Sequence, residues 1–289
     1  MDSPNFFCDL HIHTVASDGG YTAGEVVDLA VGRRMQVIAV TDHDCAASNR
    51  KAVEAGEKAG LRVIPGIELT TSERRHVLGY FLQPDDCELY RYLESLRRLS
   101  RAHMCGVLER LRPRGITVSE QELAERSGEG IPNMSHLLDL LHRRGDLTAG
   151  QFDSQEAVAL FGDPDYMVNF FREFAATRPF TDTAGAIRMI RGAGGVPVWA
   201  HPFQFGDVEE AELEKLVALG LAGLEVVTPK HDPAQREKLA QLCRNFGLVP
   251  TGGTDYHGRY FQSIEKGRQI GTCGVGPEVV EQLEQHRTG

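Results

Sequence analysis

Histidines and acidic residues follow the short apolar segments of this chain with unusual regularity. In the first case the apolar residues 6–8 lead into D-L-H-I-H-T and then S-D-G, which places His11, His13 and Asp18 within eight positions. Because side chains alternate along a strand, Asp9, His11 and His13 share one face, and Asp18 lies just past the turn. Two imidazoles at the end of one strand can bind a single metal ion. Because a metal ion needs more ligands than these, we expect a fold in which the ends of several strands lie close together.

Strand and helix patterns alternate in the first part of the chain and again in its last part. We expect strands at 37–41, 62–67, 76–81, 196–200, 224–227 and 248–251, and helices at 22–34, 48–59, 183–193, 209–219 and 233–246. Alternation at this spacing predicts an α/β fold in which βα units surround a parallel sheet or barrel.

The alternation stops in the middle of the chain, where the sequence shows helical patterns and hardly any strand. Amphipathic segments occupy 89–111, 119–122 onward, 132–144 and 154–161, and the second of them begins with a capping box. We therefore expect a metal-binding barrel made of residues 1–84 and 179–289. Residues 85–178 should form a mostly helical insertion over the barrel mouth, the end at which the carboxyl ends of the strands meet.

Composition limits the classes of function. The chain has 289 residues, 41% hydrophobic residues and a formal net charge of −10. This charge argues against binding duplex DNA, which needs a basic stripe, but divalent cations would reverse the local field for a small phosphorylated substrate. The six cysteines are scattered, and neither a signal peptide nor a long apolar segment is visible. We expect a cytoplasmic protein without membrane association, of undetermined oligomeric state.

A set of nine histidine and acidic residues lies at or beside the predicted strand ends, with one histidine opening a strand instead. Carboxyl ends of parallel barrel strands converge at one mouth, so these side chains should meet there. Nine ligands suit two or three ions, with Glu68 as a candidate bridge. Imidazole and carboxylate without thiolate fit Mn²⁺, Fe²⁺ or Zn²⁺. The candidate ligands are His11, His13, Asp18, His43, Glu68, His76, His201, Asp255 and His257.

The motifs D-L-H-I-H-T, S-D-G, T-D-H-D, P-G-I-E, H-V-L-G, A-H-P and G-T-D-Y-H, in this order, resemble the polymerase and histidinol phosphatase (PHP) family. The resemblance covers residues 6–84 and about 180–258. It implies a distorted (β/α)7 barrel, a trinuclear metal centre with Mn²⁺ as the first candidate, and metal-dependent hydrolysis of phosphoesters. The ligand sets that it implies are His11, His13, Glu68 and Asp255 for one ion, Glu68, His76 and His201 for a second, and Asp18, His43 and His257 for a third. It also marks Glu68, His201, Asp255 and His257 as the catalytic residues.

The helical insertion resembles one branch of this family, the stand-alone bacterial phosphoesterases that act on nucleotides. That branch includes 3′,5′-nucleotide bisphosphate phosphatases and enzymes that trim short 5′-phosphorylated RNA. The segment I-P-N-M-S-H at 131–136 is similar to the I-T-R-P-H segment of the branch, which makes His136 a candidate phosphate contact. The arginine and proline of that segment are not in place here.

Further candidates for substrate binding are basic side chains outside the ligand set. Lys230 and His231 follow the strand at 224–227 and should reach the mouth, where strand-end loops carry function. Arg144 lies on the insertion and, with His136, completes the expected substrate-binding residues.

The sequence does not decide the roles of two phenylalanines and one acidic residue near the strand ends. Phe203 and Phe205 follow A-H-P and could stack a base, although loop aromatics more often pack. Glu225 points either into the barrel or against a helix, and we expect it to support a metal ligand from behind.

The leading expectation is a metal-dependent phosphoric monoester hydrolase. It would remove the 3′-phosphate of nucleoside 3′,5′-bisphosphates by attack of a metal-bridging hydroxide. Alternatives are a 5′-3′ exoribonuclease acting on short 5′-phosphorylated RNA and a histidinol-phosphate-type phosphatase. An amidohydrolase also opens with H-x-H, but that class usually relies on a strand lysine absent from this sequence. A non-catalytic PHP module is disfavoured by the complete ligand set.

Overall fold

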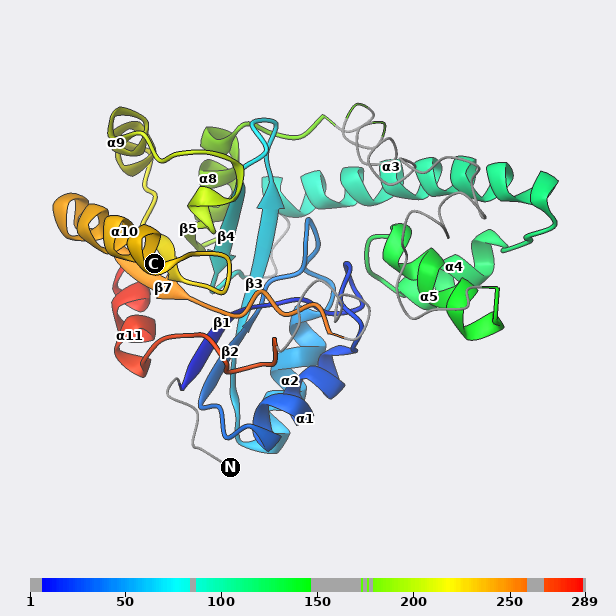
Figure 1. The fold of residues 1–289 in the computed structure, drawn as a ribbon, viewed down its shortest axis with the longest axis horizontal. Coiled ribbons are helices and arrows are strands. Elements are labelled where there is room, and N and C mark those ends of the chain that lie inside the picture. Colours follow the sequence, from blue (N-terminus) through cyan, green and yellow to red (C-terminus); the bar gives the residue numbers. More distant parts are fainter. Residues whose placement is uncertain are drawn as a thin grey trace.

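Seven strands form one sheet in the order β1 to β7 in the computed structural model, which describes residues 7–83, 87–146, 173, 176, 179–258 and 268–287. Across the two outer strands, the Tyr256 carbonyl accepts from the His13 N–H at 2.9 Å and the Tyr256 N–H donates to the His11 carbonyl at 3.3 Å. The sheet is therefore a nearly closed barrel, and the expected α/β barrel is confirmed (Figure 1). The strands are β1 (Cys8–Ile12), β2 (Val37–Val40), β3 (Arg62–Thr70), β4 (His76–Tyr80), β5 (Val196–Ala200), β6 (Gly223–Val227) and β7 (Val249–Gly252).

Strand β4 runs opposite to its neighbours, so the expectation of an all-parallel sheet is wrong at this strand. It pairs antiparallel with β3 and with β5, whereas the other neighbouring pairs are parallel. The cause is the short link from β3, residues 71–75, because a tight turn can only return the chain as a hairpin. Strand β3 also extends to Thr70, beyond its predicted end. As a result His76, at the amino end of β4, pairs with Thr70 and Ala200 at the mouth.

Helices cover the outside of the barrel, and several begin and end where the sequence predicted. Thr22 and Glu25 form the expected capping box, and Gly60 ends the second helix with φ of +71°. The last helix was not predicted. The helices around the barrel are α1 (Ala23–Gly32), α2 (Asn49–Ala59), α8 (Thr183–Gly192), α9 (Glu210–Ala218), α10 (Pro233–Phe246) and α11 (Pro277–Gln285).

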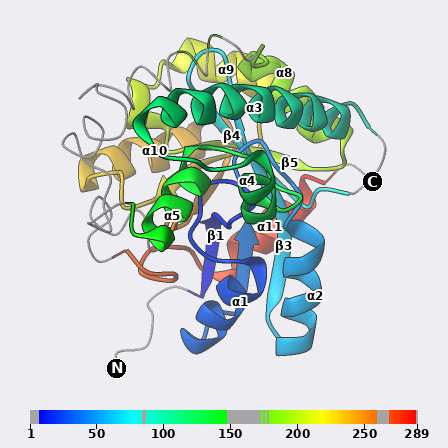
Figure 2. The ribbon, with the colours of Figure 1, turned by 90° about the vertical axis from the view of Figure 1, so that its right-hand side faces the viewer.

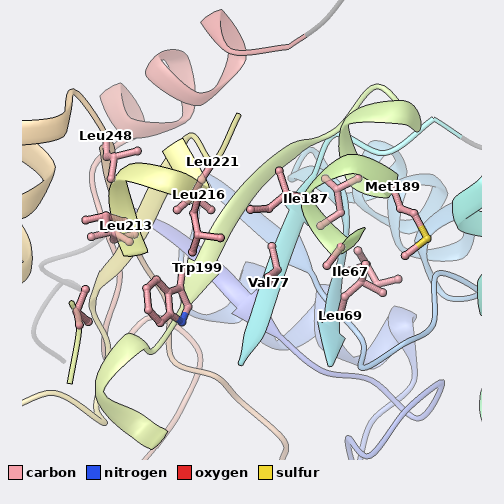
Figure 3. Close-up of a cluster of buried hydrophobic side chains, with 14 of the residues drawn as sticks. Ile67, Leu69, Val77, Ile187, Met189, Trp199, Leu213, Leu216, Leu221 and Leu248 are labelled. Carbon is pink, nitrogen blue, oxygen red and sulfur yellow. The ribbon is translucent and has the colours of Figure 1, made fainter. Parts of the chain in front are cut away.

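Two apolar layers hold these helices and orient the strands. Figure 3 shows the outer layer, in which Val77 and Trp199 of the sheet pack against side chains of α8 and α9. Leu78 and Tyr80 belong to a different cluster, shared with the other strands around the ring. Because side chains alternate along β4, His76 faces the same way as Leu78 and Tyr80, into the barrel.

Between β4 and α8, the described residues form three further helices. They are α3 (Glu88–Leu111), α4 (Glu120–Ser127) and α5 (Met134–Arg144), with a 3₁₀ turn, η1 (Arg112–Arg114), after α3. They share a core of their own, and Figures 1 and 2 show α3 running across one side of the barrel with α4 and α5 beneath it. The predicted helix at 154–161 lies outside the described residues, so the boundaries 85–178 stay a prediction. Among the described helices, none combines the length and apolar character of a membrane span.

Candidate metal centre

The nine predicted ligands meet at the barrel mouth around the carboxylate of Glu68, which is fully buried in β3. Each of its oxygens faces more than one imidazole, as expected for a bridging carboxylate. Oε1 lies 2.8 Å from His76 Nδ1 and 2.8 Å from His201 Nε2, and Oε2 lies 3.0 Å from His11 Nε2, 3.2 Å from His13 Nε2 and 3.3 Å from His43 Nδ1.

Three overlapping groups in this cluster have metal-ligand geometry. In each, one possible ligand atom per residue lies within 4.8 Å of the others: His11, His13, Glu68 and Asp255; His13, Asp18, His43 and His257; and His43, Glu68 and His76. The first group equals one set implied by the family resemblance, and the second contains another. For the remaining set, His201 reaches the same Glu68 oxygen as His76. The structure therefore brings all nine residues together, and their individual roles as ligands and catalytic residues stay predictions.

The donor set fits divalent cations. The ring of His13 lies 4.1 Å from that of His257 and 4.5 Å from that of His43, a separation at which protonated imidazoles would repel one another. Burial lowers the pKa of His43 to about 3 and that of His201 to about 4, so both rings are neutral at physiological pH. The buried Nδ1 atom of His201 has no hydrogen-bond partner in the described part of the chain. Neutral nitrogens of this kind are what a metal ion requires.

The carboxylates of the cluster are held in their charged form. Burial would raise the pKa of Glu68, but His11, whose own pKa is raised by its acidic neighbours, holds the pKa of Glu68 well below its ordinary value. Burial likewise opposes the charge on Asp255, and His11 and Lys230 lower its pKa well below the usual range. Both side chains are therefore ready to bind a cation without first losing a proton.

Backbone strain is concentrated at two of these ligands. His201 has φ of +30° and Asp255 has φ of +51°, both in a region that residues other than glycine rarely adopt. Asp9 stabilises the second position, because its carboxylate accepts hydrogen bonds from the N–H and the hydroxyl of Thr254 at 2.9 and 2.7 Å. Strain that persists because the surroundings fix it is common at functional sites.

Glu225 faces into the barrel and supports two ligands from behind. Its Oε1 accepts from His11 Nδ1 at 2.9 Å, and its Oε2 accepts from the backbone N–H of His201 at 2.9 Å. A carboxylate on one ring nitrogen leaves the other nitrogen as the metal donor and fixes the ring plane. This arrangement agrees with the supporting role expected from the sequence.

Asp42 holds the loop that carries Asp18, a role that the sequence analysis missed. Its buried carboxylate accepts from the Thr14 N–H, the Thr14 hydroxyl and the Ser17 hydroxyl, each at 2.7 Å, and from the Ser48 hydroxyl. Hydrogen bonds to a charged acceptor are stronger than neutral ones. Asp42 is the first acid of the T-D-H-D motif, and its place in that motif was the sequence signal that could have indicated this role.

The insertion holds the same loop from the opposite side. Three consecutive carbonyl oxygens, those of residues 15–17, accept hydrogen bonds from His136 Nε2 at 2.7 Å, the Ile131 N–H at 2.8 Å and Asn133 Nδ2 at 2.6 Å, respectively. Residues 131–136 form the entry to α5 and its first turn. The position of Asp18 thus depends on a segment more than a hundred residues further along the chain.

Two of the expected substrate-binding residues do not face the ligand cluster. His136 is buried, with Nδ1 accepting from the Asn133 N–H at 3.2 Å and Nε2 donating to Val15, so the structure gives it a capping and packing role instead. Arg144 lies at the other end of α5, about 12 Å away along the helix, where it pairs with Glu122 and Asp146 at 3.5 Å each. Helix geometry separates the two residues in a way that sequence proximity conceals.

The other two expected substrate-binding residues also differ from each other. Lys230 reaches the mouth as expected, where its ammonium forms an ion pair with Asp255 and donates to Gln204 Oε1 at 2.7 Å. His231 is buried instead, with Nδ1 donating to the Val226 carbonyl at 3.2 Å and its ring edge against Phe203. The geometry favours Lys230 over His231 as a contact for a substrate.

Comparisons with known proteins agree with this geometry. The PHP domain model matches residues 9–190. The chain is 30% identical over 87% of its length to phosphoribosyl 1,2-cyclic phosphate 1,2-diphosphodiesterase of Eggerthella lenta, of which 94% is covered. It is 28% identical to 3′,5′-nucleoside bisphosphate phosphatase of Chromobacterium violaceum, with 91% of this chain and 90% of the relative covered. It is 30% identical to a 5′-3′ exoribonuclease of Escherichia coli, with 95% and 92% covered. A solved structure from Bifidobacterium adolescentis shares the fold, with a TM-score of 0.80, 24% identity and coverage of 100% and 99%.

Proposed function

Because this chain belongs to the PHP domain family and is a metal-dependent phosphoesterase, we propose that it removes the 3′-phosphate of nucleoside 3′,5′-bisphosphates and leaves the 5′-monophosphate. The observation that carries this proposal is the position of Lys230, a cation joined to Asp255 at the edge of the ligand cluster. One phosphate of the substrate would lie over the ligand cluster, and Lys230 would give a second phosphate a partner.

The charge state of Lys230 supports this role. Burial favours the neutral amine, but Asp255 beside it raises the pKa of Lys230 above its ordinary value, so the ammonium stays charged. Its side chain is 22% exposed, which leaves it accessible from the mouth. A charge-assisted contact to phosphate contributes about 1.5–3 kcal/mol.

The names of two relatives point to the same substrate pattern. A phosphoribosyl cyclic phosphate and a nucleoside 3′,5′-bisphosphate are both ribose derivatives that carry two phosphate groups. In each, one phosphate can be hydrolysed while the other anchors the molecule. This shared chemistry supports a ribose bisphosphate as the substrate class of this chain.

The residues of the site would divide the work between chemistry and positioning. Glu68, Asp255 and the surrounding histidines would hold two or three divalent ions, with Mn²⁺ as the first candidate and Fe²⁺ or Zn²⁺ as alternatives. A bound divalent ion lowers the pKa of a water ligand and neutralises charge on phosphoryl oxygens. Lys230 would bind the second phosphate and orient the ester, which aids the chemical step as well as binding. Glu225 would keep His11 in the tautomer that donates Nε2 to the site.

The test compares phosphate release from adenosine 3′,5′-bisphosphate and from the 3′- and 5′-monophosphates. We expect kcat/KM for the bisphosphate to be at least about tenfold higher, which is the ratio that one such contact supplies. Lys230→Met should reduce this ratio, whereas Lys215→Met, on the exposed face of α9, should not. Equal turnover of all three nucleotides, or better turnover of histidinol phosphate, would overturn the proposal.

A 5′-3′ exoribonuclease activity is the second candidate. The observation in its favour is the similarity to the Escherichia coli exoribonuclease over nearly the whole of both chains. A 5′-phosphorylated dinucleotide, with its mononucleotide products measured by chromatography, separates the two functions, because only the second predicts faster cleavage of the dinucleotide than of the bisphosphate. Phosphoribosyl 1,2-cyclic phosphate is the corresponding probe for the activity named for the Eggerthella lenta relative.

A further inference from the structure

The two phenylalanines of the 3₁₀ turn η2 (Pro202–Phe205) have different surroundings. Phe203 is partly buried, with its ring edge-on to His231 at 5.7 Å and the ammonium of Lys238 at 5.3 Å from the ring. Phe205 is 45% exposed, and its ring stands edge-on to that of His76 at 5.7 Å. Packing therefore explains Phe203. It does not explain a large exposed aromatic ring against a candidate metal ligand, because covering such a ring is favourable.

The two arginines of the β3–β4 turn are divided in the same way. Arg75 forms an ion pair with Glu212 at 2.6 Å and lies 5.1 Å from the ring of Trp199, so it joins the turn to the helices outside the barrel. Arg74 is exposed, and its guanidinium lies 5.3 Å from the centre of the Phe205 ring. It also has φ of +64°, an uncommon conformation for a non-glycine residue. The turn thus uses one arginine for packing and presents the other beside Phe205.

Phe205 and Arg74 lie next to the candidate metal ligands. The His76 ring that contacts Phe205 also places its Nδ1 2.8 Å from Glu68 Oε1. Gln204, the residue before Phe205, accepts a hydrogen bond from Lys230 at 2.7 Å. One short segment therefore supplies the contact that holds the proposed phosphate-binding lysine and the ring beside the metal ligands.

We propose that Phe205 and Arg74 form a stacking platform for the nucleobase of the substrate. This inference rests on the proposed function, since it takes the organic part of a nucleotide as its ligand. A nucleotide with one phosphate over the ligand cluster and one at Lys230 presents its base to the surroundings of the mouth, where these two side chains lie. Phenyl and guanidinium groups both offer flat faces to a heterocycle, and stacking on them is tolerant of base identity.

The first test compares adenosine 3′,5′-bisphosphate with ribose 3,5-bisphosphate, which lacks the base. We expect kcat/KM of the wild-type enzyme to be at least about fivefold higher for the nucleotide, the lower end of what base stacking contributes. The ratio should fall toward one in Phe205→Ala and Phe205→Leu, and it should be retained in Phe205→Tyr. Arg74→Ala should lower the ratio in part. The matched control Arg188→Ala, an exposed arginine on α8, should leave it unchanged.

A binding measurement separates this inference from the proposed function. Isothermal titration calorimetry would compare adenosine 5′-monophosphate with ribose 5-phosphate on the wild-type protein and on Phe205→Ala. If the wild-type protein binds adenosine 5′-monophosphate more tightly than ribose 5-phosphate, and Phe205→Ala abolishes this difference, the platform is supported. This holds even if bisphosphates turn out not to be substrates. If bisphosphates are preferred substrates but removal of the base changes neither turnover nor binding, the platform is overturned and the proposed function stands. A base preference that Phe205→Ala leaves intact overturns the assignment to Phe205.

Discussion

On one side of the barrel mouth, residues 14–18 are fixed from two directions, by the carboxylate of Asp42 and by three donors of the insertion. On the other side, Gln204, Phe205 and Arg74 are exposed to solvent. The first side positions Asp18, a candidate ligand whose atoms must be placed to within a fraction of an ångström. The second side surrounds the proposed substrate contacts, which must remain open until a ligand arrives. The hydrogen-bonded loop that positions a candidate ligand and the exposed residues proposed to contact the substrate thus lie on different sides of the same mouth.

The largest effect should come from Glu68, which joins the candidate ligand groups. Glu68→Ala should remove more than one ion, because a bridging carboxylate serves two. Loss of activity should exceed the roughly 10–100-fold effect typical of a residue behind a ligand. Elemental analysis of the purified variant measures the ion content, and full occupancy would contradict the bridging role.

Glu225→Gln is the matched control for Glu68. It alters the support of His11 and His201 without removing an oxygen from the ligand cluster. We expect weaker metal affinity by roughly 10–100-fold, with every ion still bound at saturating metal.

The next largest effect should come from the fixed side of the mouth. Asp42→Asn places an amide NH₂ against donors that now face a carboxylate oxygen. Donors left without an acceptor in a buried site should lower the free energy of unfolding by about 2–3 kcal/mol. Urea denaturation in the presence of a chelator measures this change without a contribution from metal binding. Asp28→Asn, an exposed acid on α1, is the control, and an equal loss in both variants would mean that the hydrogen-bonded network is unimportant.

His136 predicts a dependence of stability on pH. Burial lowers the pKa of His136 to about 4, so the folded protein keeps it neutral while the unfolded chain takes up a proton near pH 6.5. Keeping His136 neutral therefore costs no stability above pH 6.5. As the pH falls toward 4, the free energy of unfolding decreases, and the decrease is about 1.4 kcal/mol by pH 5.5. His136→Gln, which can keep the capping box, should show a smaller loss over this range. The difference between variant and wild type removes the contribution of the other histidines. His142→Gln, exposed on the same helix, should behave as wild type.

The smallest expected effect distinguishes the two roles of Asn133. This residue caps α5 and donates to the Ser17 carbonyl, whereas Ser119 caps α4 and belongs to a capping box without a hydrogen bond to the mouth. Either residue changed to alanine should cost about 1 kcal/mol of stability. Only Asn133→Ala should also weaken the ion expected at Asp18, His43 and His257, which metal titration monitored by elemental analysis would reveal. Equal metal affinity in the two variants would show that the insertion does not position that ligand.

Sequence alone determined the elements whose signals are local. The capping boxes at Thr22 and Ser119 and the glycine at the end of α2 lie where they were expected, because caps depend on residues only a few positions apart. The nine candidate ligands were also found from the sequence, because each follows or opens an apolar strand and only the ends of strands converge. These features need no knowledge of distant contacts.

Tertiary structure decided what depends on distant contacts. The direction of β4 follows from pairing with β3 and β5, and it brings His76 to the mouth although it opens its strand. Of the two partners of His136, the Val15 carbonyl comes from the loop after β1, so no local pattern could show that both of its ring nitrogens are used. Phe203 and Phe205 are the same residue type two positions apart, and nothing in the sequence separates their roles. Only Phe205 is left exposed beside His76. A side chain's role here depends on which surface packs against it, and that surface is supplied by residues far away in the chain.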